Sequence, residues 1–345
     1  MTGRERVKLA KSYKAPDIVP VEYYYTGTPV YEHGERVNDF LAKYPGDFGP
    51  FTAIHPVIPE TDFDPDGTYH AFRKDEWGTT WEYHIYGVAG IEYDYPLRDL
   101  DDVDNYKLPP VISVDDKKAF ADYKQHVKNH QKQYYYSEGI GGFFEKLIAL
   151  RPFEDVLCDL MVHEEKLVKL LDMLTDHFEK HITAAIAAGA DGIAFGDDFG
   201  TELSLIFSPD IFREYFFPRY KKLIEPARAA GLDVHFHSCG KVISLFEDFR
   251  KMGVNSVWPQ LPLYDLKELS YILKDLGLAL AIHTDRANTM TFGTPDDVKE
   301  LVNREFDIFR PDKGGSWFYI ESDNGFPYEN IKALVETVAG FRIKK

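Results

Sequence analysis

The stretch DVHFHSCG at residues 233–240 begins a strand–turn–helix pattern that recurs along much of the chain. Residues 233–236 are typical of a short apolar strand, Gly240 allows a turn, and residues 242–252 are typical of a helix. Side chains two residues apart on a strand share a face, so His237 and Cys239 can point at one atom. Imidazole and thiolate are both good zinc ligands. The stretch therefore predicts a strand–helix unit with a candidate metal pair where the strand ends.

The same strand–helix unit recurs on both sides of this stretch. We expect further strands at 192–195, 255–259, 278–283 and 317–321, and further helices at 164–188, 208–230, 265–276, 294–309 and 328–339. Strands that alternate with helices form parallel sheets with right-handed crossovers. Regular βα repeats are therefore predicted over residues 131–345.

Two arrangements of these units are open, a doubly wound sheet and a closed barrel. The chain has no Gly-x-Gly-x-x-Gly fingerprint, which a dinucleotide-binding sheet would need. Polar residues follow nearly every expected strand, as they do at the carboxyl end of a barrel, where active sites are built. The sequence therefore favours an α/β fold of the (β/α)8 TIM-barrel type, with all 345 residues in a single domain.

The first 130 residues are less regular than the rest. A first strand is expected within residues 17–25, a hairpin around the polar and aromatic stretch 75–82, and a surface excursion in the acidic stretch 94–110. No repeat and no linker interrupts the chain, so this part is predicted to be an irregular N-terminal segment of the same domain.

Composition excludes several classes of function. The net charge is −17 and no basic run occurs, which argues against nucleic-acid binding. No apolar stretch approaches the roughly 20 residues of a membrane helix, and the first residues do not resemble a signal peptide. Two cysteines form no disulfide framework, so we expect a cytoplasmic protein. Aromatic residues make up 15% of the chain, which is consistent with an aromatic pocket or simply with aromatic packing.

His237 and Cys239 need further ligands to form a metal site. A catalytic zinc usually has three protein ligands and an open position. Candidates at neighbouring strand ends are Glu321, Asp323 and His283. The alternative is a buried cysteine beside a histidine that bonds a backbone carbonyl. Two other residues of these types are expected to pack rather than bind: Cys158 in a core-facing helix and His235 below His237 on the same strand face.

Acidic residues follow two of the other expected strands. Asp197 and Asp198 alternate in direction, so only one of them is expected to enter the site, with helix capping as the alternative role. Asp285 follows a strand of apolar residues, and Arg286 could bind an anionic substrate or pair with Asp285. Glu202 is a weaker candidate. No Gly-x-Ser-x-Gly elbow or phosphate-binding loop is present, which argues against serine hydrolases and P-loop enzymes.

Several segments together resemble the uroporphyrinogen decarboxylase-like superfamily, in particular its cobamide (corrinoid) methyltransferase branch. The resemblance extends over most of residues 70–340 and depends on the order and spacing of its pieces. The matching pieces are residues 75–78 with Trp81, 144–160, 189–192 with 196–198, 208–218, 237–241 and 327–331.

The resemblance implies a (β/α)8 barrel and a zinc site. Members of this branch hold zinc with a His-x-Cys pair and a distant cysteine, and His237 and Cys239 match the pair. The distant position falls near residues 320–323, where this chain has no cysteine, so Glu321 is the expected substitute. True uroporphyrinogen decarboxylases carry an arginine-rich N-terminal segment, whereas residues 21–25 contain no arginine.

These observations favour a zinc-dependent methyltransferase that moves a methyl group between a small methylated compound and a corrinoid protein. A methoxylated aromatic is one candidate substrate. The resemblance implies zinc on His237, Cys239 and Glu321 and a corrinoid carried by a partner protein. From their places at strand ends, Asp198 and Asp285 are expected to be catalytic residues that orient the substrate. The alternatives are a metal-free tetrapyrrole decarboxylase of the uroporphyrinogen type and a non-catalytic tetrapyrrole or corrinoid binder.

Overall fold

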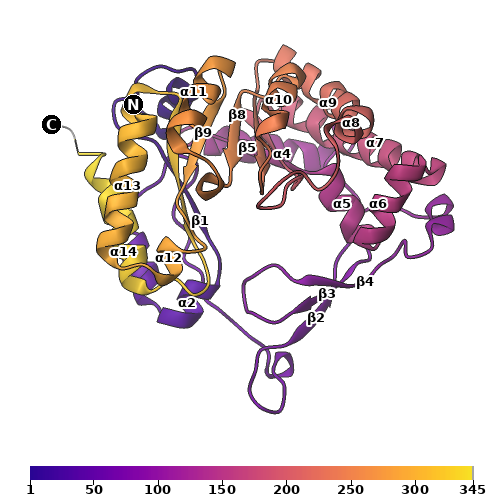
Figure 1. The fold of residues 1–345 in the computed structure, drawn as a ribbon, viewed down its shortest axis with the longest axis horizontal. Helices are drawn as coiled ribbons and strands as arrows, with labels where there is room; N and C mark the ends of the chain where they lie inside the picture. The colour runs from indigo at the N-terminus through magenta and orange to yellow at the C-terminus, as the bar shows by residue number, and fades with distance from the viewer. Residues whose placement is uncertain (344–345) are drawn as a thin grey trace.

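A curled sheet of parallel strands forms the centre of the molecule (Figure 1). The structure is a computed structural model and describes residues 1–343. Seven strands lie in the order β1-β10-β9-β8-β7-β6-β5, and every neighbouring pair is parallel. The strands are β1 (Val21–Tyr25), β5 (Ser137–Gly141), β6 (Gly192–Gly196), β7 (Asp233–Ser238), β8 (Ser256–Pro259), β9 (Ala279–His283) and β10 (Ser316–Ser322). The predicted α/β class is confirmed.

The closed eight-stranded barrel is confirmed only as far as these seven strands. Within residues 1–343, β1 and β5 are the edges of the sheet and no eighth strand joins them. A single residue, Asp47, bridges the two edges: its N–H donates to the Val21 oxygen at 2.8 Å, and its own oxygen accepts from the Tyr135 N–H at 3.0 Å. The chain between β1 and β5 supplies no further βα unit, because it forms a separate antiparallel sheet instead.

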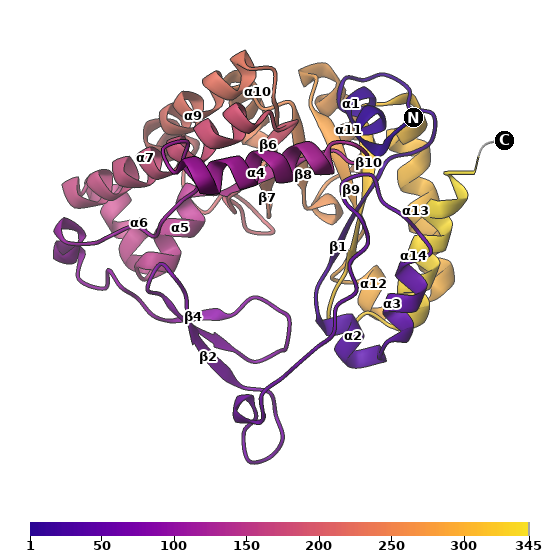
Figure 2. The same ribbon diagram turned by 180° about the vertical axis from the view of Figure 1, so that it is seen from behind.

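Helices cover the convex side of the sheet (Figures 1 and 2). They are α7 (Glu165–Ala188), α8 (Pro209–Ile211), α9 (Phe217–Ala229), α10 (Phe246–Met252), α11 (Leu266–Leu276), α13 (Pro295–Phe309) and α14 (Tyr328–Gly340), with short helices α5 (Phe143–Leu150), α6 (Phe153–Val162) and α12 (Thr289–Phe292) near the strand ends. The helix expected at 208–230 is interrupted by a π-helical turn at Phe212–Phe216, just before Pro218. Proline has no N–H to donate, which explains a break at this point.

The pleat of each strand separates core side chains from candidate site side chains. On β7, Val234 and Phe236 are buried, and the Phe236 ring stacks on Phe249 of α10 at 4.5 Å. His235 and His237 therefore point to the other, concave face of the sheet. The apolar face of the strand packs against the helices, and the side chains of the polar face are available for chemistry.

The N-terminal part is more ordered than its sequence predicts. It contains helices α1 (Gly3–Lys11), α2 (Thr28–His33), α3 (Arg36–Leu41) and α4 (Lys117–His130). The acidic stretch 94–110 does carry exposed aspartates, but Leu97, Leu100 and Val103 anchor it in the core. Among residues 1–343, no helix combines the length and apolarity needed to cross a membrane.

A small antiparallel sheet lies across the open side of the curled sheet (Figure 1). Its strands are β2 (Ala71–Lys74), β3 (Thr80–Tyr83) and β4 (Ile91–Asp94), in the order β2-β3-β4. The turn at Asp75–Thr79 joins β2 to β3, with the Asp75 N–H donating to the Thr79 oxygen at 2.9 Å. The hairpin predicted around residues 75–82 is therefore confirmed.

Candidate functional site

The candidate residues gather at the carboxyl edge of the curled sheet. Because all seven strands are parallel, their carboxyl ends share one edge. Asp198 follows β6, His237 lies on β7 with Cys239 just beyond, His283 ends β9 and Glu321 lies near the end of β10. In the strand register, His237 lies opposite Gly196 on one side and Trp258 on the other.

Contacts with β8 orient the His237 ring. Its Nδ1 lies 2.8 Å from the backbone oxygen of Trp258, which can only accept a hydrogen bond. Nδ1 therefore carries the ring proton, and Nε2 keeps its lone pair. The Trp258 ring packs on the imidazole with centroids 4.0 Å apart. Burial lowers the pKa of His237, so the ring stays neutral at pH 7 and Nε2 is available as a ligand.

Cys239 and Asp198 face the free nitrogen of His237. Nε2 lies 3.4 Å from the Cys239 Sγ and 3.4 Å from the Asp198 Oδ1. The Cys239 N–H donates to the same Asp198 oxygen at 2.7 Å, which ties the β6 and β7 ends together. Burial, and then the negative charge of Asp198, raise the pKa of the Cys239 thiol to about 12. The thiol is therefore protonated unless a cation compensates the thiolate charge.

The turn after Cys239 is fixed by close backbone packing. Gly240 has a φ of +81°, and a Cβ there would meet the Gly200 carbonyl carbon at 2.1 Å. Its N–H donates to the Gln260 side chain at 3.1 Å, and its oxygen accepts from the Tyr264 hydroxyl at 2.8 Å. Only glycine fits this position, and the fit holds Cys239 against His237.

These three side chains form a group that could hold a metal ion. Their ligand atoms all lie within 4.8 Å of one another. Zn–N distances near 2.0–2.1 Å and Zn–S distances near 2.3 Å place neighbouring ligands of a tetrahedral zinc roughly 3.3–3.6 Å apart. The separations of 3.4 Å around His237 Nε2 fall in this range. The hydrogen bond from Nδ1 to a backbone oxygen is the outer contact that metal-binding histidines usually make.

The structure brings Glu321 to other partners. Its Oε2 lies 2.6 Å from the His283 Nε2, and its Oε1 lies 3.3 Å from the Arg286 Nη1. Burial opposes ionisation, but His283 and Arg286 overcome it and lower the pKa of Glu321. Glu321 is not in the group of ligand atoms around Cys239, where Asp198 occupies the third position. Its role as a ligand stays a prediction, and the geometry favours Asp198.

The acidic pair after β6 divides its roles as expected. Asp197 is fully buried and accepts from the N–H groups of Phe144 and Glu145 at 3.0 and 2.7 Å, so it caps the start of α5. Burial raises the pKa of Asp197 to about 7. Only Asp198 turns toward the site.

Asp285 lies at the rim of the site and also acts as a cap. Its carboxylate accepts from the Asn288 and Thr289 N–H groups at 3.1 and 3.3 Å. Arg286 pairs with Glu321 rather than with Asp285. Asp285 is thus held rigidly beside the cavity.

A cavity of about 100 Å³ opens beside His237 and Cys239. His237, Cys239 and Trp258 form one wall, and residues 283–288 form the facing one. The Trp258 ring packs against the Tyr319 ring at 4.2 Å and the His283 ring at 5.2 Å, and Trp258 and His283 line the cavity. Glu202 is exposed and also lines this cavity.

Two packing predictions have different outcomes. His235 lies below the site, with Nδ1 3.0 Å from the Ser256 hydroxyl and its ring 5.5 Å from Trp317, as expected. The prediction that Cys158 is a core thiol is wrong, because its side chain is exposed. On α6 the buried positions are Val156 and Leu160, and a residue midway between them faces away from the core.

Glu145 is the residue near this site that the sequence analysis missed. It lies at the start of α5, where the charges of Asp197 and Asp198 act on it. Its side chain is exposed in part to solvent, but desolvation by the surrounding protein, and then these two carboxylates, raise its pKa to about 8. The signal in the sequence was its place directly after β5 and the turn at Gly141 and Gly142, the same strand-end position that identified the other candidates.

Comparison with known proteins gives a family and structural relatives. The sequence model described as uroporphyrinogen decarboxylase (URO-D) matches residues 80–341. A search of curated proteins finds no match. The structure is similar to a methyltransferase from Methanosarcina mazei over 99% of both chains, with a TM-score of 0.66 and 16% identity. At this identity the likeness shows a shared fold.

Two dihydropteroate synthases match only part of the chain. A dihydropteroate synthase from Anaplasma phagocytophilum is 16% identical, with 49% of this chain and 68% of the other covered and a TM-score of 0.37. One from Thermus thermophilus is 13% identical, with 60% and 66% covered and a TM-score of 0.34.

Proposed function

Because this chain belongs to the uroporphyrinogen decarboxylase family and shares the fold of a methyltransferase from Methanosarcina mazei, we propose that it is a zinc-dependent methyltransferase. The reaction would move a methyl group between a small methylated compound and a corrinoid carried by a partner protein. The observation that carries the proposal is the convergence of His237 Nε2, Cys239 Sγ and an Asp198 oxygen beside the cavity.

Each of the three side chains has a defined part in this proposal. His237 would bind through Nε2, because Nδ1 is committed to the Trp258 oxygen. Cys239 would bind as a thiolate, and Asp198 would complete a three-residue set that leaves one position for substrate. Zinc held there would act as a Lewis acid on the heteroatom that bears the methyl group, making it a better leaving group.

The surroundings favour an uncharged substrate with an apolar part. Arg286 is the cation beside the cavity, but its guanidinium already lies 3.3 Å from Glu321 and 3.8 Å from Asp323. It is therefore neutralised and poorly suited to grip a further carboxylate. The Trp258 ring lines the cavity and supplies aromatic surface there, which supports a methoxylated aromatic compound as substrate. Asp285, fixed by its capping bonds, would orient the substrate at the rim.

The same charges argue against a tetrapyrrole decarboxylase. Such a substrate carries many carboxylates and needs free arginines, whereas the candidate site contains Asp198, Asp285 and a neutralised Arg286. If the metal-free protein decarboxylated a tetrapyrrole, that result would replace our proposal.

Metal content tests the zinc assignment. The full chain, purified without chelator, is compared with Cys239→Ala and with Cys158→Ala, which removes the exposed cysteine. We expect Cys239→Ala to lose one zinc per chain and Cys158→Ala to lose none. Equal zinc content in all three proteins would overturn the assignment.

A second pair of variants identifies the third ligand. We expect Asp198→Ala to weaken zinc binding by more than the 10- to 100-fold typical of outer-contact changes. Glu321→Gln should stay within that range, because Glu321 contacts His283 and Arg286. The reverse order would restore Glu321 as the ligand. Methyl transfer from a panel of methoxylated aromatics to a free corrinoid then tests the reaction, and zinc-loaded protein that transfers no methyl group would contradict it.

A further inference from the structure

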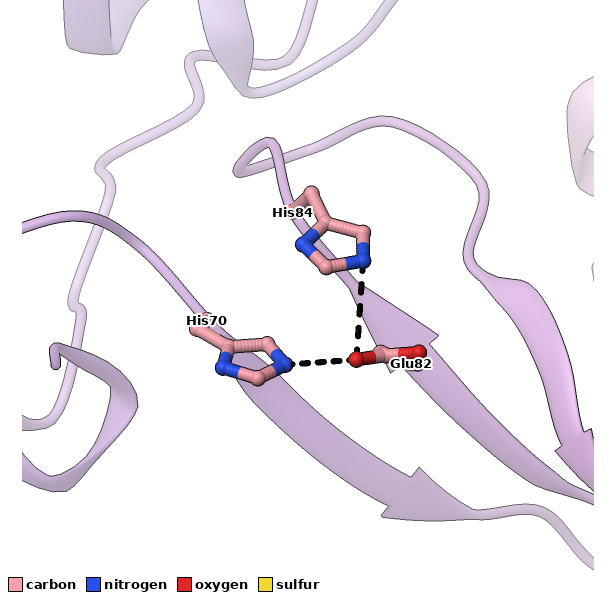
Figure 3. A group of neighbouring side chains, drawn as sticks. All are labelled: His70, Glu82 and His84. Carbon is pink, nitrogen blue, oxygen red and sulfur yellow. Dashed lines mark hydrogen bonds and ion pairs between the residues drawn. The ribbon is translucent and has the colours of Figure 1, made fainter.

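A second group of ligand-type side chains lies on the small antiparallel sheet (Figure 3). His70 precedes β2, Glu82 lies on β3 and His84 follows β3. Ala71 pairs with Tyr83 and Phe72 with Glu82, so this register places residue 70 opposite residue 84. Residues 82 and 84 are two apart and share a face. The hairpin register therefore brings all three side chains to one side of the sheet.

The three side chains converge on one carboxylate oxygen. The His70 Nε2 lies 2.7 Å from the Glu82 Oε1, and the His84 Nε2 lies 3.5 Å from the same atom. The ligand atoms of all three residues lie within 4.8 Å of one another. Figure 3 shows both imidazole rings directed at Glu82, one from the chain before β2 and the other from the chain after β3. His70 and Glu82 are half-buried, and His84 is exposed.

An outer carboxylate orients His70. Its Nδ1 lies 3.1 Å from the Asp64 Oδ2, while Nε2 faces Glu82. The hydrogen bond with Glu82 is the main factor that raises the pKa of His70. A protonated His70 between two carboxylates would account for these two contacts. It would not account for His84, whose ring stacks on His70 at 5.0 Å with 12° between the planes.

We propose that His70, Glu82 and His84 form a zinc site that ties the start of β2 to the end of β3. Two imidazole nitrogens and one carboxylate form a known set of zinc ligands, with the fourth position left for water. The carboxylate of Asp64 on His70 Nδ1 is the outer contact that fixes ring orientation in such sites. A cation between the rings also explains why two histidines turn toward each other and toward one oxygen. This site is independent of the one at Cys239.

Metal titration of the full chain tests this proposal. His84→Ala removes an exposed ligand, so the hairpin keeps its buried contacts and the variant should fold. The matched control is His55→Ala, which removes an exposed histidine paired with Glu35 at 3.0 Å. We expect His84→Ala and Glu82→Gln to bind one zinc fewer per chain than the unmodified protein. His55→Ala should bind the same number as the unmodified protein.

The absorption spectrum of bound Co²⁺ distinguishes this site from the one at Cys239. A Co²⁺ ion bound to a thiolate shows a sulfur-to-metal charge-transfer band in the near ultraviolet, and one bound by two histidines and a carboxylate does not. Cys239→Ala should lose the band and keep the visible Co²⁺ absorption, whereas His84→Ala should keep the band. The double variant should lose both. The hairpin site would be overturned if His84→Ala and Glu82→Gln left the zinc stoichiometry unchanged, both in the protein that keeps Cys239 and in Cys239→Ala.

Proteolysis tests the structural consequence of binding. Zinc should slow cleavage within residues 84–90, the loop that follows β3, in the unmodified protein and in His55→Ala. It should have no effect in His84→Ala. Equal protection by zinc in His84→Ala would mean that the ion acts elsewhere, and the proposal would fail.

Discussion

The curled parallel sheet and the small antiparallel sheet position their ligand groups in different ways. On the parallel sheet, β9 and β10 are buried along their whole length. On the small sheet, three of four residues in β2 and in β4 are exposed. His237 is therefore held by the core of the protein, whereas His70 and His84 are held by the register of a single hairpin. A bound metal therefore contributes more to fixing the positions of ligand side chains on an exposed hairpin than on a buried sheet.

The small sheet docks on the rest of the molecule mainly through its β2–β3 turn. The Trp77 ring packs edge-on against His177 of α7, with centroids 5.0 Å apart. The Trp77 oxygen accepts from the Tyr106 hydroxyl at 2.6 Å, and the Thr79 hydroxyl donates to the Ala149 oxygen at 2.6 Å. These few contacts replace the continuous core of the parallel sheet, so the two regions should respond differently to substitution.

Removing one phenylalanine from each sheet measures this difference most directly. Phe236 on β7 is 1% exposed and stacks on Phe249, so we expect Phe236→Ala to cost about 3–5 kcal/mol of unfolding free energy. Phe72 on β2 is 47% exposed, and Phe72→Ala should cost under about 1 kcal/mol. Urea unfolding of both variants provides the measurement. Comparable losses would mean that the small sheet shares the core of the parallel one.

The parallel sheet was also the region most predictable from sequence. Its strands are short apolar runs between helices, and these runs fix where each strand ends. The pairing of His237 with Cys239 followed from parity alone, because β7 continues through Ser238. Alternation also predicted that only one of Asp197 and Asp198 would enter the site, although the place of Asp198 beside Nε2 depends on the neighbouring strand.

Features that depend on distant partners could not be predicted from local pattern. The contact of Glu321 with His283, which lies 38 residues away in sequence, was not predicted, and its role as a metal ligand stays a prediction. The helices of the first 130 residues are short or mostly exposed, and α1 begins with a local capping box at Thr2 and Glu5 rather than a long apolar stripe. The absence of an eighth strand among residues 1–343 could not be predicted from local pattern either, because it depends on how the residues between β1 and β5 pair, and they form an antiparallel sheet instead of a βα unit.

Acid should weaken the junction between the two regions through His177. Burial, and then nearby positive charges, lower the pKa of His177 to about 4, whereas the unfolded chain has a pKa near 6.5. Between these values the unfolded state binds more protons, so stability is complete above pH 6.5 and falls as the pH drops toward 4. We expect a loss of roughly 2 kcal/mol from this residue.

Urea unfolding at pH 7 and at pH 4.5 isolates the contribution of His177. His177→Gln should show a smaller difference in unfolding free energy between the two pH values than the unmodified protein. His126→Gln, which changes an exposed histidine on α4, should keep the full difference. If His177→Gln kept it too, the pH dependence would have to come from other groups.

The smallest expected effect concerns the cation above Trp77. The Lys146 Nζ lies 4.0 Å from the Trp77 ring centroid, a geometry that contributes about 1 kcal/mol when partly desolvated. Lys146→Met keeps the apolar stem and removes the charge, so only the docking of the β2–β3 turn should weaken. Hydrogen exchange of amides in residues 71–83 should become about fivefold faster, while amides of β7 keep their rates. Lys124→Met, which removes a lysine 6.0 Å from Phe120 within α4, serves as the control. Faster exchange in both sheets would show that they open together, and the distinction between a core-held site and a hairpin-held site would then be lost.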